Sequence, residues 1–494
     1  MKSTCLDRSH SFSFLIEVCY IALSTTLPFM KLLPLLAILM LAACTPTASE
    51  NESSSTDMPA TSFTGAADEV KLMTLDPGHF HAALVQKNTY PQIDSVVYVY
   101  APEGDDVQQH LNRIEQFNTR AEEPTHWEEE VYTGPDFFEK MMEQQPGNVV
   151  VLSGNNAKKT EYIHASVEGG LNVLADKPMV IEPQDYSILE EALSLADEKG
   201  VLLYDIMTER YEITTMLQRA LSQRPEVFGE LEKGTVEEPA ISKESVHHFF
   251  KYVSGNPLVR PAWFFDVSQQ GEGIVDVSTH LVDLILWETF PDQAIDTTDV
   301  EVVSARRWAT ELDAEQFKKV TGLDEFPDYL NSAIKDDKLE VFANGEINFT
   351  TRGIHGKASV IWNYQAPEGA ADTHYSIMRG TKANLVIRQD AEQEYKPTLY
   401  VEPVGSTARE ELEMALEAAL EDLRAQYPDL ASRPSGDGWE IVIPDTLKKG
   451  HEAHFAQVTE KYLQYLIDGE LPEWERTNML TKYYVTMQGY EMSR

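Results

Sequence analysis

Short apolar runs alternate with segments of helical periodicity through the first half of the chain, and no other feature constrains the fold as strongly. The runs VKLMTL (70–75), SVVYVY (95–100), VVVLS (149–153) and LNVLA (171–175) have the length and β-rich composition of buried strands. Because helical patterns separate these runs, we predict a doubly wound parallel sheet over residues 69–208. In such a sheet, ligands bind beyond the carboxyl ends of the strands.

The second half of the chain has strand-like segments separated by Gly, Asp and Pro turns, which is typical of antiparallel sheets. We predict an α+β domain with a largely antiparallel, open sheet over residues 209–494, so the whole chain is an α/β protein of two domains. Residues 409–426 are expected to form a solvated acidic helix, and residues 450–468 a long helix that packs back on the first domain. The expected strands are 339–344, 346–351, 358–364, 374–379 and 384–389.

The N-terminal region has the features of an export signal. Met30-Lys31 precedes the apolar run LLPLLAILMLAAC, which is too short to span a bilayer and ends in small residues before Cys44. This ending resembles the lipobox of bacterial lipoproteins, which implies a lipidated Cys44, export and an outer-membrane anchor. We expect residues 1–43 to be the signal, with Met30 as an alternative start, and residues 44–68 to be a flexible tether.

Charge and cysteine content argue against several classes of function. The chain has 40 Lys+Arg against 81 Asp+Glu, a net charge of −41. Such a surface repels phosphate backbones, so no nucleic-acid partner is expected. All three cysteines lie at or before Cys44. The remainder has no thiol for a disulfide, a thiolate nucleophile or a cysteine-ligated metal centre.

The turn after the first expected strand, DPGHFH (76–81), is an incomplete dinucleotide fingerprint. The glycines of G-x-G-x-x-G would fall on Asp76, Gly78 and His81, and only the middle position is glycine. Gly78 is the position where backbone approaches a pyrophosphate. After the second strand, Pro102 stands where an acid usually binds ribose, with Glu103 one step further. The choice between NAD and NADP therefore stays open.

The same turn supports a second interpretation. His79 and His81 form a His-x-His pair at a strand end, a spacing used by metal-dependent amidohydrolases, since alternate residues of an extended segment point the same way. That interpretation needs further ligands from an eightfold barrel, and the β-rich second half lacks such a repeat. In a third interpretation one histidine caps the helix and the other packs. We rank a metal behind cofactor contact and packing, and expect no metal.

The segment LNVLADKPM (171–179) follows Gly169-Gly170, with Ser153-Gly154-Asn155-Asn156 one helix earlier. This arrangement resembles the glucose–fructose oxidoreductase / inositol dehydrogenase (Gfo/Idh/MocA) family, with Asp176-Lys177-Pro178 in place of Glu-Lys-Pro. The resemblance implies a Rossmann domain that holds NAD or NADP, with Lys177 in the crevice. The cofactor-binding residues would be Asp76, Gly78, His79, Phe80, His81, Glu103, Ser153, Asn155, Asn156, Asp176 and Lys177.

A second motif, GEGIVDVSTHLVDLILW (271–287), matches the family pattern of a Gly-rich turn followed by Asp-x-x-x-His on a helix. Asp276 and His280 are four residues apart and are expected to share one helix face. The resemblance implies that His280 acts as general base on a substrate hydroxyl and that Lys177 stabilises the alkoxide. Asp276 would orient or tune His280, while hydride passes to the nicotinamide.

Further residues are expected on the substrate side, namely Glu209, Arg210, Tyr211, Arg260, Trp263 and Asp266. Arg260, Trp263, Asp266 and His374 resemble a lipoprotein-associated oxidoreductase subgroup with its own C-terminal domain type. The resulting prediction is an NAD(P)-dependent oxidoreductase of a sugar or polyol, with tightly bound cofactor and a possible homo-oligomer through the second sheet. The alternatives are an NAD-dependent glycosidase that uses transient oxidation, and a non-catalytic sugar-binding lipoprotein.

Overall fold

The computed structural model describes residues 63–253, 256–405 and 407–494. The expected signal, the lipidation site Cys44 and most of the expected tether lie outside the described residues. Among the helices that are described, none is long and apolar enough to cross a membrane.

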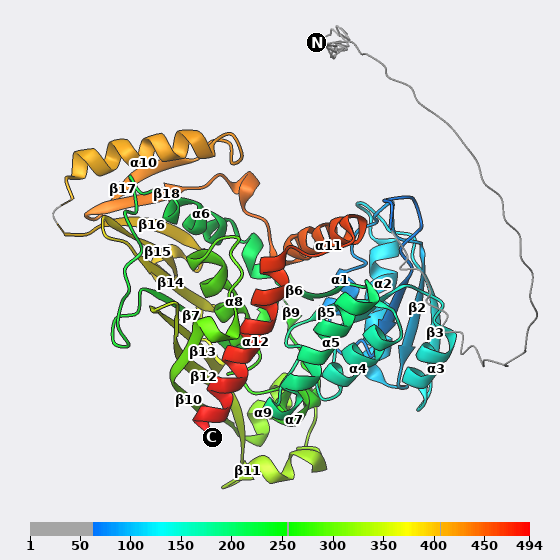
Figure 1. Cartoon of the computed structure of the whole chain (residues 1–494). Coiled ribbons are helices and arrows are strands. Elements are labelled where there is room, and N and C mark those ends of the chain that lie inside the picture. Colours follow the sequence, from blue (N-terminus) through cyan, green and yellow to red (C-terminus); the bar gives the residue numbers. More distant parts are fainter. Residues whose placement is uncertain (1–62, 254–255, 406) are drawn as a thin grey trace, which may run out of the picture. The chain divides into compact units, whose positions relative to one another are not determined.

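The first sheet has six parallel strands in the order β3-β2-β1-β4-β5-β6 (Figure 1). This is the strand order of a Rossmann domain, and the predicted doubly wound sheet is confirmed. Its inner strands are fully buried, as their continuous apolar runs require. The bounds are β1 Leu72–Leu75, β2 Val96–Ala101, β3 Glu128–Thr133, β4 Val149–Leu152, β5 Asn172–Asp176 and β6 Leu203–Ile206.

Helices connect successive strands of this sheet. The first, α1, is a single turn, His81–Leu84. Turn-forming residues and Pro91 follow before β2 and limit the helix. The other helices of this half are α2 Asp105–Thr119, α3 Phe137–Gln144, α4 Lys159–Glu168 and α5 Tyr186–Lys199.

The second sheet has ten strands, with the path β10-β12-β13-β7-β14-β15-β16-β18-β17 and β11 paired to β12. Its pairs are antiparallel except for β13 beside β7, which confirms the expected largely antiparallel sheet. The bounds are β7 Ile241–Phe250, β10 Val300–Leu312, β11 Ile334–Lys335, β12 Lys338–Thr351, β13 Ile354–Gln365, β14 Thr373–Arg379, β15 Ala383–Gln389, β16 Thr398–Pro403, β17 Ala431–Ser435 and β18 Gly438–Val442.

Two expected strands, 339–344 and 346–351, are one continuous strand, β12. Gly345 does not end the strand; it makes room for a neighbouring turn. A Cβ at this position would lie 2.6 Å from the Cα of Ile274. The glycine thus allows the turn before α8 (Val277–Thr289) to lie directly on the sheet.

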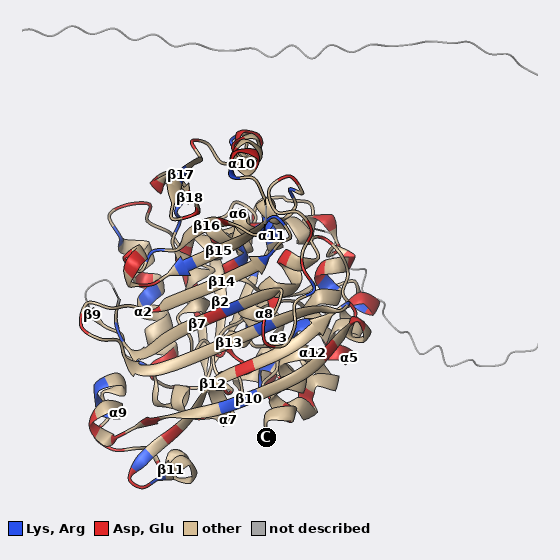
Figure 2. Ribbon diagram, turned by 90° about the vertical axis from the view of Figure 1, so that its left-hand side faces the viewer, with Lys and Arg blue, Asp and Glu red and all other residues tan. Residues whose placement is uncertain are grey.

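Of the remaining helices, α6 and α12 pack against the second sheet, whereas α11 lies beside the first domain (Figure 1). Helix α10 carries many more acidic than basic side chains, in agreement with the acidic, solvated helix predicted for residues 409–426 (Figure 2). The expected long helix is α11, and its His451 and Phe455 pack on His81 of the first domain. The bounds are α6 Ile213–Ser222, α7 Val267–Gln270, α9 Ala314–Thr321, α10 Arg409–Leu423, α11 His451–Asp468 and α12 Glu473–Ser493.

A buried ionic network ties α12 to both halves of the chain. The Arg210 guanidinium donates to Asp283 on α8, with two nitrogen–oxygen distances of 2.6 and 2.7 Å, and to Glu475 on α12. Lys482 Nζ lies 2.8 Å from carboxylate oxygens of both Asp283 and Asp205, the latter on β6. Every member is almost completely buried, so each charge depends on its partners.

Replacing Asp283 with Asn is expected to destabilise the fold strongly, because Arg210 and Lys482 would each lose a buried carboxylate. The expected loss in the free energy of unfolding is about 3–5 kcal/mol, measured by denaturant titration. The control is Asp324→Asn, which breaks an exposed pair with Lys318 and should cost at most about 1 kcal/mol. Equal stability of the two variants would contradict a structural role for the network.

Candidate functional site

An ion pair joins the two halves of the chain at the carboxyl end of β5. Lys177 Nζ lies 2.5 Å from Asp276 Oδ1, and their side chains are 13% and 9% exposed. Burial alone would lower the pKa of Lys177, but the nearby carboxylates of Asp276 and Asp176 outweigh it and raise the pKa. Lys177 is therefore a firmly held ammonium in a largely water-excluded cleft.

The turn that precedes α8 positions Asp276. A Cβ on Gly273 would lie 1.7 Å from the carbonyl oxygen of Ala343 on β12, so only glycine allows this approach. Asp276 is the N-cap residue of α8, and its second oxygen accepts a hydrogen bond of 3.0 Å from Gln270 Nε2. Asp276 thus contacts Lys177 and Gln270; no hydrogen bond joins it to His280. The expectation that Asp276 directly orients His280 is not met by this geometry.

His280 lies on the first turns of α8 and lines a cavity of about 300 Å³. Burial and the charge of Lys177 hold its pKa well below the usual value, so its imidazole is neutral at pH 7. Its Nδ1 is buried and has no hydrogen-bond partner among the described residues. A neutral imidazole that lines a cavity is able to accept a proton from a ligand at a ring nitrogen that faces the cavity.

Four further histidines line the same cavity, and the sequence reasoning did not select any of them as substrate-binding residues. They come from β7, β14 and α11, which are far apart in the sequence. Burial lowers the pKa of His374 and of His451 to about 3, and that of His454 to about 4. The cavity therefore offers uncharged imidazoles as hydrogen-bond partners. The four are His247, His374, His451 and His454.

Of the expected segment 209–211, only Glu209 lines this cavity. Burial, with a smaller contribution from Glu212, raises the pKa of Glu209 to about 7. Arg210 forms buried ion pairs with Asp283 and Glu475, so its guanidinium stabilises the fold and does not bind a substrate. Tyr211 is partly buried and does not line the cavity.

The turn after β1 brings His79 and His81 beside Asp176 at the end of β5. His81 Nδ1 lies 2.9 Å from Asp176 Oδ2, and His79 Nδ1 lies 3.7 Å from the same oxygen. The amide of Gly78 donates to Asp76 O, and that of His79 donates to Ser153 O. These amides are thus bonded within the protein, unlike those of an open phosphate-binding loop. Phe80 is exposed and contacts His79.

The turn after β4 is tied to the second domain. Asn155 Nδ2 donates to Gln269 Oε1 at 2.7 Å, and Asn156 donates to the backbone of 269 and 270. Ser153 Oγ donates to Asp176 Oδ2 at 2.9 Å. These three expected cofactor residues therefore lie at the same edge of the sheet as Lys177, as the strand order requires.

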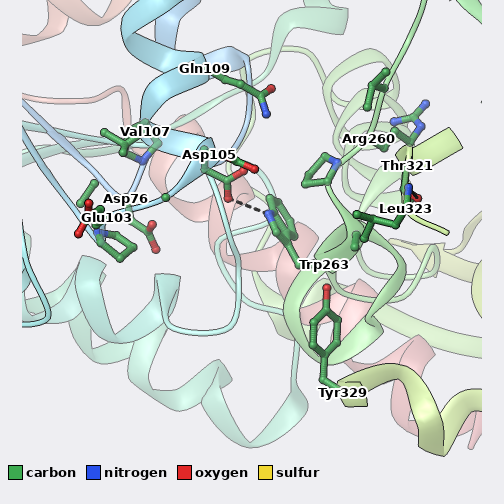
Figure 3. Close-up of a pocket in the computed structure, with 18 residues that line it drawn as sticks. Asp76, Glu103, Asp105, Val107, Gln109, Arg260, Trp263, Thr321, Leu323 and Tyr329 are labelled. Atoms are coloured by element: carbon green, nitrogen blue, oxygen red, sulfur yellow. Dashed lines mark hydrogen bonds between the residues drawn. The ribbon is translucent and has the colours of Figure 1, made fainter. Parts of the chain in front are cut away.

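A second cavity, of about 490 Å³, opens between the ends of β1 and β2 and the segment around Trp263 (Figure 3). On one side are Asp76 and Glu103, and on the other are Arg260 and Trp263. Burial and repulsion from Asp106 raise the pKa of Asp76 to about 6. The cavity is thus acidic on its Rossmann side.

Trp263 and Arg260, expected on the substrate side, lie at this second cavity instead. The Trp263 indole donates to Asp106 Oδ2 at 2.8 Å, and its ring would lie 3.2 Å from a Cβ on Gly78. Arg260 donates to the carbonyls of His248 and Phe249. Asp266 caps α7 by accepting from the amide of Ser268. These are contacts within the fold, which motif positions alone do not reveal.

A dinucleotide fits this crevice at one end more readily than at the other. The cavity at the ends of β1 and β2 is large enough for a nucleoside and carries an acid, Glu103, beside the β2 exit. At the turn itself, Trp263 lies against Gly78. A pyrophosphate at Gly78 therefore requires the Trp263 side chain to move.

Residues 217–494 match the family model described as "Putative oxidoreductase C terminal domain". The chain belongs to this oxidoreductase family. A crystal structure of a putative oxidoreductase from Parabacteroides merdae is 56% identical, covers 87% of this chain and 99% of its own length, and has a TM-score of 0.86. None of the curated proteins matches the chain.

More distant structures share the fold. A 3-ketoreductase from Actinomadura kijaniata, in complex with NADP and TDP-benzene, is 14% identical over 84% of this chain and 95% of its own, with a TM-score of 0.51. Biliverdin reductase from Synechocystis, in complex with biliverdin and NADP+, is 12% identical over 86% of this chain and 99% of its own, with a TM-score of 0.52. These neighbours agree with the Gfo/Idh/MocA-like architecture predicted from the sequence.

The raised pKa of Glu209 predicts how stability depends on pH. The folded state holds the proton more tightly than the unfolded chain, whose value is near 4.5. The stability that the folded state gains from protonated Glu209 is complete below about pH 4.5, falls as the pH rises toward 7, and is absent above pH 7. Glu209→Gln should therefore gain in melting temperature relative to the wild type between about pH 5 and pH 7.5. The melting temperature of the exposed variant Glu230→Gln should differ from that of the wild type by the same amount at every pH. A difference that is equally independent of pH in Glu209→Gln would contradict the raised pKa of Glu209.

Proposed function

We propose that the chain is an NAD(P)-dependent oxidoreductase that acts on a hydroxyl group of a sugar or polyol. The observation that carries this proposal is the arrangement around Lys177. Asp276 holds a buried ammonium at the end of β5, and His280 follows Asp276 by four residues on α8, where burial and the charge of Lys177 lower its pKa. An ammonium and a neutral imidazole are two groups that alcohol oxidation needs.

His280 is the proposed proton acceptor. As a neutral imidazole that lines the cavity of about 300 Å³, it would take the hydroxyl proton of the substrate at a ring nitrogen. The adjacent positive charge of Lys177 opposes the protonation of free His280, but the same charge stabilises the alkoxide that forms as the proton leaves. Asp276 acts as a positioning residue, because it fixes the Lys177 ammonium at 2.5 Å.

The lining of the smaller cavity supports a polyhydroxylated substrate. Neutral imidazoles, together with Ser245, Thr373 and Glu209, provide both donors and acceptors within about 300 Å³. His374 Nδ1 already lies 3.0 Å from Ser245 Oγ, which orients its ring. Several hydroxyl groups of a sugar can be bound here without a charged ligand group.

The nicotinamide group would supply the acceptor for the hydride. Support for it comes from the strand order of the first sheet, the cavity beside Glu103, and NADP complexes among proteins of the same fold. Glu103 and the backbone of 101–105 would hold the adenosine end, and Asn155, Asn156 and Lys177 the opposite end. Export, predicted from residues 30–44, would require the cofactor to be retained through the catalytic cycle.

Replacing His280 with Gln is expected to lower turnover by about 10²- to 10⁴-fold, because the glutamine side chain has a similar reach but cannot accept the substrate proton. Turnover is measured with a panel of sugars and polyols by the absorbance of reduced nicotinamide, and binding of the dinucleotide should be unchanged. The control is His126→Gln, a change of an exposed histidine.

Wild-type turnover in the His280 variant would remove this residue as the base. Product analysis in the same assay separates two reactions. Accumulation of a keto sugar supports net oxidation, whereas release of free sugar from glycosides would show that oxidation is transient and serves cleavage of the glycosidic bond.

The acidic side of the larger cavity predicts a preference for NAD over NADP. Glu103 and Asp105 line the cavity at the β2 exit and would repel the additional phosphate of NADP. The affinity for NAD, measured by calorimetry at low salt, should exceed that for NADP by about five- to tenfold. The variant Glu103→Gln should reduce this ratio of affinities. The exposed variant Glu122→Gln is the control. A wild type that binds NADP more tightly would contradict this account.

A further inference from the structure

Three side chains that could coordinate a metal meet where the sequence departs from its family pattern. His81 stands at the third glycine of the dinucleotide fingerprint, and Asp176 replaces the glutamate of Glu-Lys-Pro. In the structure these two departures are in contact, with His81 Nδ1 2.9 Å from Asp176 Oδ2. His79 joins them from the same turn, and one ligand atom from each residue lies within 4.8 Å of the other two.

The surrounding fold holds this cluster firmly. Asp176 is the last residue of β5, and its Oδ2 also accepts a hydrogen bond from Ser153 Oγ at 2.9 Å. Lys159 Nζ donates to the Asp176 carbonyl at 3.0 Å. On the other side, the rings of His451 and Phe455 pack on His81 at centroid distances of 4.9 and 4.6 Å. Such supporting contacts orient the ligands of metal sites in proteins.

We propose that His79, His81 and Asp176 bind a divalent transition-metal ion. Two imidazoles and one carboxylate suit zinc, iron(II), cobalt(II) or manganese(II) and leave coordination positions open for a ligand. Ligands about 2.0–2.2 Å from one ion are roughly 3–3.5 Å apart. The distances of 2.9 and 3.7 Å from Asp176 Oδ2 lie on either side of this range.

A cation at this place would compensate for two features of the turn. The amides of Gly78 and His79 are bonded to Asp76 O and Ser153 O, so they are not free to bind an anion. The cavity beside the turn is lined by four acidic residues, Asp76, Glu103, Asp105 and Asp106. An ion held by these three residues would provide a positive charge to which an oxygen atom of a bound ligand could coordinate. One of the three residues, Asp176, directly precedes Lys177 in the sequence. The metal site goes beyond the proposed function and does not depend on it.

The test uses the folded chain stripped of metal and titrated with cobalt(II) alone, without dinucleotide or sugar. The expected result is the uptake of about one equivalent, with visible absorption bands from nitrogen-ligated cobalt and a matching content of zinc after zinc exchange. His79→Ala and Asp176→Asn should each weaken binding at least about tenfold. The exposed variant His126→Ala should bind as the wild type does.

Melting curves of each variant establish that it is folded, and His79→Ala is the more informative because the His79 side chain is 29% exposed. The proposal is overturned if the wild type takes up no more cobalt than a folded His79→Ala variant. The cluster would then be a hydrogen-bonded group only. Failure of the proposed oxidation does not affect this result, because the titration measures the metal without turnover.

Discussion

The ion pair between Lys177 and Asp276 is the interaction on which the rest of the site depends. Lys177 directly follows β5 of the parallel sheet, Asp276 is the N-cap of α8, and the two charged atoms lie 2.5 Å apart with both side chains largely buried. Since a lone buried charge is costly, each residue needs the other, and the contact fixes how the first sheet meets the second domain. Burial, together with the charge of the same ammonium, lowers the pKa of His280 and keeps it neutral.

Two cavities lie at this junction. The smaller one is lined by five histidines together with Glu209, Glu212 and Asp372, which favours hydrogen bonding to hydroxyl groups. The larger one is acidic on the side of β1 and β2, and Trp263 separates it from the turn at Gly78. A small polyol suits the first cavity and a nucleoside the second, with Lys177 at the edge of the first sheet and His280 facing the smaller cavity.

The sequence predicted the parts of the molecule that rest on local patterns. The apolar runs located β1, β2, β4 and β5 of the first sheet, and the Asp-Lys-Pro and Asp-x-x-x-His motifs contain the residues of the Lys177–Asp276 pair. The helix α12 was missed because Lys482 and Glu475, which are buried in the ionic network, place charged residues on the face of the helix where an amphipathic pattern has apolar ones. Strand β10 was also missed, because its sequence VEVVSARRWATEL has no sustained alternation of apolar and polar residues.

Long-range contacts explain why the remaining site predictions differ from the structure. Arg210 has the residue type of a substrate contact, but its partners Asp283 and Glu475 are distant in the sequence. Trp263 reaches Asp106 across the domains, and His374 and His451 enter the smaller cavity from separate elements. No local motif signals such contacts.

Native mass spectrometry of the purified chain tests the central claim most directly. The account predicts a stoichiometric mass increment of NAD or NADP on the folded protein, and a chain that stays at its unliganded mass with both dinucleotides in excess would contradict it.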